Sequence, residues 1–69
     1  MIDLLKKINM LLQALPSKQR EAFYFRFIEE FSFSDIADIQ KTTISTVLSR
    51  VRYAVNKLQI ALKKEGVLE

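Results

Sequence analysis

Hydrophobic residues recur along the chain at spacings of three and four, which is the period of a helix with one buried face. The apolar positions of the first segment are Leu4, Leu5, Ile8, Leu11, Leu12 and Leu15. This pattern predicts a helix over residues 2–15. Pro16 is expected to end it, because proline disfavours helical geometry in the residue before it.

The second segment is dense in aromatic residues. Ser17 is a candidate N-cap, since its hydroxyl can accept a bond from a free backbone N–H. A helix is predicted from Lys18 to about Glu30. Its many aromatic side chains leave few polar positions, so we expect this helix to be largely buried.

Two further helices follow, each preceded by a hydroxyl residue. Ser32 is expected to cap a short helix over residues 33–40, with Asp35 three positions on as in a capping box. Thr43 is expected to cap a long last helix, and Gly66 to end it. Its apolar stripe comprises Ile44, Val47, Leu48, Val51, Ala54, Val55, Leu58, Ala61 and Leu62.

The pattern as a whole predicts an all-α fold of four helices in one domain, residues 1–69. A short helix, a tight turn and a long helix with a polar outer face give the order of a helix-turn-helix at about residues 33–56. A stack of helical hairpins would give the same spacing, so that alternative stays open.

Composition narrows the function classes. With no His and no Cys, the chain lacks the ligands of a structural zinc site and the partners of a Ser-His type of triad. The acidic pairs Asp35/Asp38 and Glu29/Glu30 lack a third partner and a Gly-rich phosphate loop. We therefore expect no enzyme activity, no metal, no cofactor and no small-molecule substrate. No apolar run approaches the ~18 residues of a membrane span, so no membrane association is expected.

Charge is distributed unevenly along the chain. Residues 39–64 carry six basic residues and no acidic one, whereas residues 21–38 carry five acidic residues against Arg26. A basic segment of this kind suits a polyanion, and it also suits a solubilising helix surface. The candidate groove-facing side chains of the last helix are Ser45, Thr46, Ser49, Arg50, Arg52 and Tyr53. The candidate phosphate contacts are Lys18, Arg20 and Lys41.

Three blocks of residues share their order and spacing with a known family. They are Leu15-Pro16 with Arg20, Glu21 and Phe23, then residues 31–39, then Thr46, Val47, Ser49, Arg50, Val51, Ala54 and Leu58. Together, over about residues 12–62, they resemble region four of bacterial sigma factors of the extracytoplasmic-function type.

The resemblance implies a cytoplasmic initiation factor that reads the −35 promoter element and docks on the β flap of RNA polymerase. It also implies an anti-sigma factor as a further partner. In the family Ser49 and Arg50 correspond to a Ser-Arg pair, Thr46 to a threonine, and Arg20 to an arginine that reaches backbone phosphate. The family's region two is not in this sequence, so a fragment of a longer sigma factor and a free-standing regulator are both open.

Several positions depart from the family pattern. Leu48, Tyr53 and Val55 stand where the family often has basic residues, and Lys41 stands where it has the turn glycine. Gln40 replaces a leucine and Ser45 a glycine. Leu48, Val55 and Leu62 could form an apolar strip for a protein partner or a homodimer. The chain would then be an interaction module for polymerase, an anti-sigma factor or a second copy of itself, with little or no DNA readout. The same residues could instead be core against the first helix, which we favour.

Overall fold

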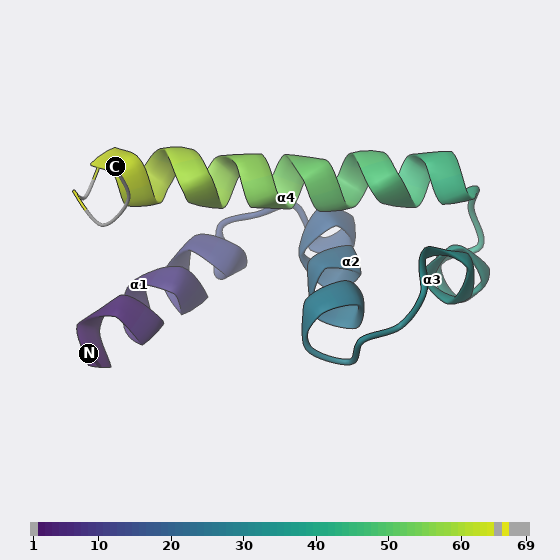
Figure 1. Cartoon of the computed structure of the whole chain (residues 1–69), viewed down its shortest axis with the longest axis horizontal. Coiled ribbons are helices and arrows are strands. Elements are labelled where there is room, and N and C mark those ends of the chain that lie inside the picture. The colour runs from purple at the N-terminus through teal and green to yellow at the C-terminus, as the bar shows by residue number, and fades with distance from the viewer. Residues whose placement is uncertain (1, 65, 67–69) are drawn as a thin grey trace.

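The computed structural model describes residues 2–64 and 66, and this part of the chain contains four helices and no strand. The helices are α1 (Ile2–Gln13), α2 (Ser17–Phe27), α3 (Phe33–Gln40) and α4 (Ile44–Lys64). Figure 1 shows α4 as a long rod with the other three helices along one side of it. The predicted all-α, four-helix fold is thus confirmed. Residues 1, 65 and 67–69 of the predicted domain lie outside the described residues.

The start of α2 differs from the prediction. The N-cap is Pro16, with φ −54° and ψ 144°, and no side chain caps the helix. The Pro16 carbonyl accepts the Arg20 N–H at 3.0 Å, which is the first bond of the helix, so Ser17 is already helical. The prediction of Ser17 as the N-cap is therefore wrong, because proline takes the extended cap conformation itself.

The aromatic helix α2 is less buried than its composition suggests. It ends at Phe27, three residues before the predicted end, and Ala22 is its buried residue. The exposed fractions of Phe27 and Ile28 are 51% and 62%. The reason is the course of α2, which starts beside α4 and extends away from it, so that its C-terminal end lies away from the rod (Figure 1).

The short helix α3 has the predicted bounds, and its caps account for them. The Ser32 hydroxyl accepts the Asp35 N–H at 3.0 Å. At the other end Lys41 is left-handed, with φ 55° and ψ 51°. The N–H of Thr42 bonds the Ala37 carbonyl, and the N–H of Lys41 bonds that of Asp38. This is the Schellman pattern that ends a helix and turns the chain sharply.

The long helix α4 begins as predicted at its threonine cap. Thr43 Oγ1 accepts the Thr46 N–H at 3.1 Å and donates to Thr46 Oγ1 at 3.0 Å. At the C-terminal end Gly66 has a φ of 76°, in the left-handed region, and its N–H bonds the Lys63 carbonyl. The turn between α3 and α4 is thus closed by local bonds on both sides.

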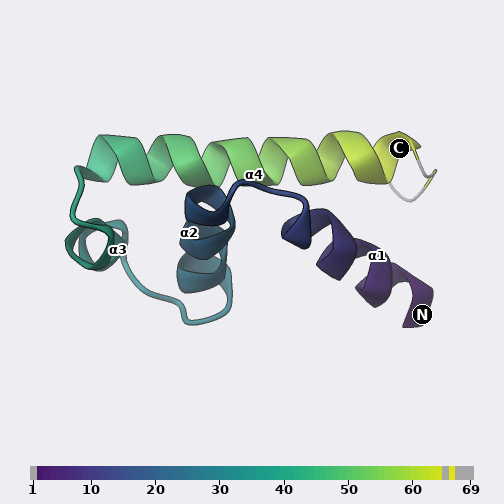
Figure 2. The ribbon, with the colours of Figure 1, turned by 180° about the vertical axis from the view of Figure 1, so that it is seen from behind.

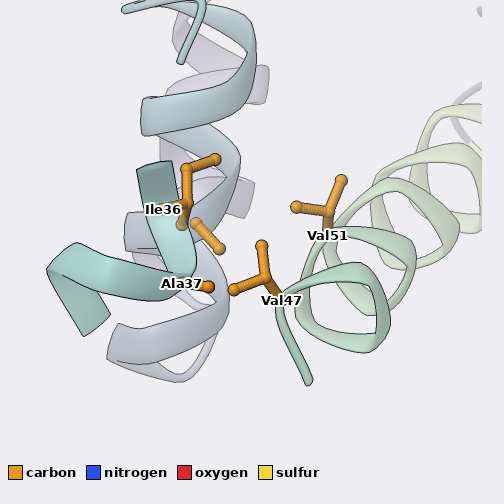
Figure 3. Packing of buried hydrophobic residues seen from close by; sticks show 5 residues of the cluster. Ile36, Ala37, Val47 and Val51 are labelled. Carbon is orange, nitrogen blue, oxygen red and sulfur yellow. The ribbon is translucent and has the colours of Figure 1, made fainter. Parts of the chain in front are cut away.

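Two apolar clusters lie under α4, one beneath each half. The first joins α2, α3 and α4 through Ala22, Ile36, Ala37, Val47 and Val51, and Figure 3 shows how these side chains converge. The second joins α1 to the other half of α4 and consists of Leu12, Leu15, Ala54 and Leu58. Figure 2 shows the same division from behind, with α3 near the start of α4 and α1 beside its C-terminal half.

The three residues of the apolar strip considered from the sequence, Leu48, Val55 and Leu62, are half-buried in the structure. Val55 packs against the first cluster, which joins α2, α3 and α4. In the part of the chain that is described, no helix combines the length and the hydrophobicity needed to cross a membrane.

Candidate nucleic-acid interface

Three of the predicted contact residues share one exposed line on α4. Ser45, Ser49 and Arg52 are spaced four and three apart, which places them on one face of the helix. All three are exposed, and Asn56 continues the line. The predicted exposure of these residues is confirmed, and their contact with DNA stays a prediction.

The other three predicted residues of α4 flank this line and have partners within the protein. Thr46 is half-buried and takes part in the Thr43 cap. Tyr53 is 41% exposed, and the Lys57 ammonium lies 5.6 Å from the centre of its ring. Arg50 is half-buried and donates from Nη1 to the side chain of Gln40.

Gln40 connects all three helices around the turn. Its Oε1 accepts the Arg50 Nη1–H at 2.8 Å. Its Nε2 donates to the Lys18 carbonyl at 3.1 Å and to Glu21 Oε1 at 2.9 Å. The first turn of α2 and the second turn of α4, which the sequence analysis treated separately, are therefore brought together.

Sequence reasoning noted Gln40 only as a replacement of leucine and missed this role. A signal was available, because Gln40 lies four residues after Ile36 and three after Ala37, on the apolar face of α3. A polar side chain at such a position must find partners inside the protein. Only 8% of its surface is exposed.

The three predicted phosphate contacts differ in their surroundings. Lys18 is exposed in the first turn of α2, and Lys41 is exposed at the turn between α3 and α4. Arg20 is half-buried, and its Nη1 donates to the carbonyls of Gln13 at 3.2 Å and Leu15 at 3.3 Å. Arg20 therefore fixes the end of α1, a role that its position in the sequence does not reveal.

The acidic segment, residues 21–38, begins beside these cations, because Glu21 Oε1 accepts from the Gln40 amide that also binds the Lys18 carbonyl and Arg50. Asp35 is exposed in the first turn of α3, where the helix dipole favours a negative charge. Arg26 has a structural role. Its Nη1 donates to the Phe31 carbonyl at 3.1 Å, and its guanidinium lies 4.6 Å from the centre of the Phe33 ring. Within the described ranges, no group of three or more potential metal ligands occurs.

An apolar groove runs between α1 and the C-terminal half of α4, and we refer to it as the α1–α4 groove. It comprises two adjoining hollows of 340 and 440 Å³ that share Leu11, Ala14 and Ala61. Met10 and Ile60 are exposed along it, and Lys7, Lys57 and Lys64 contribute to its walls. Exposed apolar surface of this kind is typical of protein-binding sites.

One comparison with known proteins bears on the identity of the chain. The model of the family described as "Sigma-70, region 4" matches residues 5–58. The matched segment includes most of α1, all of α2 and α3, and α4 as far as Leu58. It therefore contains both apolar clusters and all nine of the predicted contact residues.

Proposed function

Since the chain belongs to the family of sigma-70 region 4 domains, we propose that the exposed side chains in the first turns of its α4 read the promoter. Domains of this family bind the −35 promoter element during transcription initiation and act together with RNA polymerase. The chain is a DNA-binding component of a sigma factor and not an enzyme.

The reading residues that we propose are Ser45, Ser49 and Arg52, which form the exposed line of α4. Arginine donates two bonds to the O6 and N7 atoms of guanine, and serine can donate to or accept from either base of a pair. Thr46 and Tyr53 flank this line and would contact the walls of the major groove of the DNA. Arg50, held at the side of α4, is assigned to a phosphate.

Further phosphate contacts are assigned to Lys18, Lys41 and Arg20. The first N–H groups of α2 have no side-chain cap, so they stay available to an anion beside the Lys18 ammonium. Arg20 uses one nitrogen on the end of α1, and its other N–H groups could still meet phosphate.

The observation that carries this proposal is the link through Gln40 between the uncapped start of α2 and Arg50, which flanks the exposed line of α4. Backbone contacts fix the orientation of a protein on the duplex, and base contacts supply sequence information. A single surface that combines an anion-binding helix start with an exposed, basic recognition helix meets both needs.

The test is fluorescence anisotropy with a labelled −35 duplex at two salt concentrations. Arg52→Ala should weaken binding about tenfold, through the loss of a base contact. Lys63→Ala is the matched control, because it removes one positive charge from the same exposed line, about 16 Å further along the helix. The proposed interface would be contradicted if the two substitutions lowered the affinity equally. It would also be contradicted if the affinity of the wild-type protein did not change with salt concentration.

We also assign the chain to the extracytoplasmic-function group and to the cytoplasm, on the three residue blocks that resemble that group. A panel of −35 duplexes from promoters of this group and from housekeeping promoters tests the first assignment. Tighter binding to the housekeeping duplexes would reject it. The second is tested by microscopy of the fluorescently tagged protein, which should coincide with the chromosome.

Docking on the β flap of RNA polymerase is assigned to the α1–α4 groove, and an anti-sigma factor that covers this groove would compete with polymerase. Met10→Asp places a charge at the groove, so it should weaken binding to a purified flap fragment at least tenfold while −35 binding is kept. Asn9→Asp adds the same charge at an exposed polar position of α1 and serves as the control. If both variants bind the flap as well as the wild type does, the groove is not the docking site.

A further inference from the structure

Gln40 is the buried polar residue of the core, in a helix whose other buried residues are Ile36 and Ala37. It is the last residue of α3, directly before the left-handed Lys41. A buried amide is tolerated only when its polar atoms have partners, and here both Oε1 and Nε2 are hydrogen-bonded.

The partners determine which way the amide points. Nε2 meets two acceptors, the Lys18 carbonyl and Glu21 Oε1, while Oε1 meets a donor, Arg50 Nη1. A flipped amide would place an acceptor against two acceptors and a donor against a donor. The three bonds therefore all select the same orientation of the amide.

This arrangement has a direct consequence for Arg50. One N–H of its guanidinium is bound to Gln40, and its remaining N–H groups have no hydrogen-bond partner among residues 2–64 and 66. An arginine that is already held in place loses less side-chain entropy when it binds a phosphate than a freely rotating arginine does. The bond thus favours DNA binding without using up the guanidinium.

The same bonds also give the Glu21 carboxylate a hydrogen-bond partner. Glu21 is the acidic residue of this network, and its Oε1 accepts from Gln40. With leucine at position 40, neither the carboxylate nor the guanidinium would have this amide as a partner, and they would be free to pair with each other. Such a pair would turn Arg50 towards the protein and offset its charge.

We propose that Gln40 is a positioning residue of the DNA interface, which holds Arg50 for a phosphate and keeps Glu21 from neutralising it. This inference rests on the proposed function, because it needs Arg50 to contact DNA. It assigns to the turn a residue that does not itself reach the duplex but sets the affinity of one that does.

The test is a double-mutant cycle on the affinity for a labelled −35 duplex. Arg50→Ala should lower the slope of log K against log salt by about one unit, as the loss of one phosphate contact does. Gln40→Leu should weaken binding about threefold to tenfold. In the Arg50→Ala background, Gln40→Leu should have no further effect, because its influence passes through Arg50.

A structural role alone would give a different pattern. Ile36→Val removes one methyl group from the same helix without touching the network, so it should lower stability and leave the affinity of the folded protein unchanged. Glu21→Gln should restore part of the affinity that Gln40→Leu loses, since no carboxylate is then left to pair with Arg50.

A measurement on the wild-type protein avoids any failure of a variant to fold. The Arg50 Nε–Hε group should show a higher ¹⁵N order parameter than that of Arg52, which is exposed on the same helix. Equal order parameters would overturn the proposal, and so would additive effects of Gln40→Leu and Arg50→Ala. If Arg50→Ala binds DNA with wild-type affinity and salt slope, the assignment of Arg50 under the proposed function fails instead.

Discussion

Replacing Lys41 by glycine tests whether the turn between α3 and α4 carries backbone strain that serves DNA binding. Lys41 has a φ of 55° and a ψ of 51°, a left-handed conformation that crowds the β-carbon of any L-residue other than glycine. Glycine takes this conformation without the clash, and it is the usual residue where a Schellman motif ends a helix.

The expected gain follows from two opposing effects. Relief of the left-handed conformation stabilises the fold by about 1–2 kcal/mol. Glycine also makes the unfolded chain more flexible, which takes back about 0.4–1 kcal/mol. At the midpoints of these ranges the net gain in the free energy of unfolding is about 0.8 kcal/mol, or a rise in Tm of roughly 3–6 °C for a domain of this size.

The same substitution should weaken DNA binding. If Lys41 contacts a phosphate, its removal lowers the salt slope by about 0.9. Circular dichroism melts and anisotropy titrations at several salt concentrations measure the two effects separately. Lys41→Ala distinguishes their causes, because it removes the charge and keeps the β-carbon: the DNA effect should remain without the gain in Tm.

Glu30→Gly is the matched control for the backbone, since Glu30 also has a positive φ, of 59°, but lies in the loop between α2 and α3. It should raise Tm by a similar amount and leave the DNA salt slope unchanged. The reasoning is refuted if Lys41→Gly lowers Tm, or if Glu30→Gly weakens DNA binding as strongly as Lys41→Gly does.

Three further substitutions test the contacts that hold the helices. Ser32→Ala removes the cap of α3 and should cost about 1 kcal/mol in urea unfolding, and an unchanged midpoint would show that the cap bond does not stabilise the fold. Arg20→Ala leaves two carbonyls at the end of α1 without this donor. We expect the free energy of unfolding to fall by about 1–2 kcal/mol and the amide hydrogens of α1 to exchange faster. Faster exchange in α3 alone would contradict this role. Ile36→Ala empties a fully buried position and should cost about 2–4 kcal/mol, whereas Ile39→Ala, at a half-exposed position one turn on, should stay within about 0.5 kcal/mol. Similar losses at the two isoleucines would contradict the assignment of the core.

Local signals predicted the element boundaries wherever a side-chain cap decides them. Ser32 and Thr43 cap α3 and α4 as expected, because a hydroxyl before an apolar periodic segment has few other roles. The prediction failed at Ser17, where proline precedes the serine and takes the cap position. Both residues favour a helix start, and the sequence does not rank them.

The extent to which α2 is buried could not be predicted from the sequence, for a different reason. Its aromatic content indicates a core helix, but Phe27 and Ile28 are exposed because the C-terminal end of α2 extends away from α4. The direction in which one helix crosses another is set by packing between residues far apart in the chain. The spacing of apolar residues within residues 17–30 does not indicate this direction.

In the candidate site, residues on the outer line of α4 were predictable and partners were not. The exposure of Ser45, Ser49 and Arg52 follows from helical spacing alone. The partners of Arg50 and Arg20 depend on contacts between α1, α2, α3 and α4. A basic residue in a sequence shows its charge, and only the folded chain shows whether that charge is turned to solvent or to a carbonyl.

The continuity of α4 has a mechanical consequence. On the proposed assignments, one unbroken helix carries the promoter-reading residues near its start and one wall of the polymerase groove near its end. The angle between bound DNA and bound polymerase is then a matter of helical phase. Each residue added or removed between Arg52 and Ile60 would rotate one binding partner about the axis of α4 by about 100° relative to the other. The number of residues between these positions therefore sets the relative orientation of DNA and polymerase in the initiation complex.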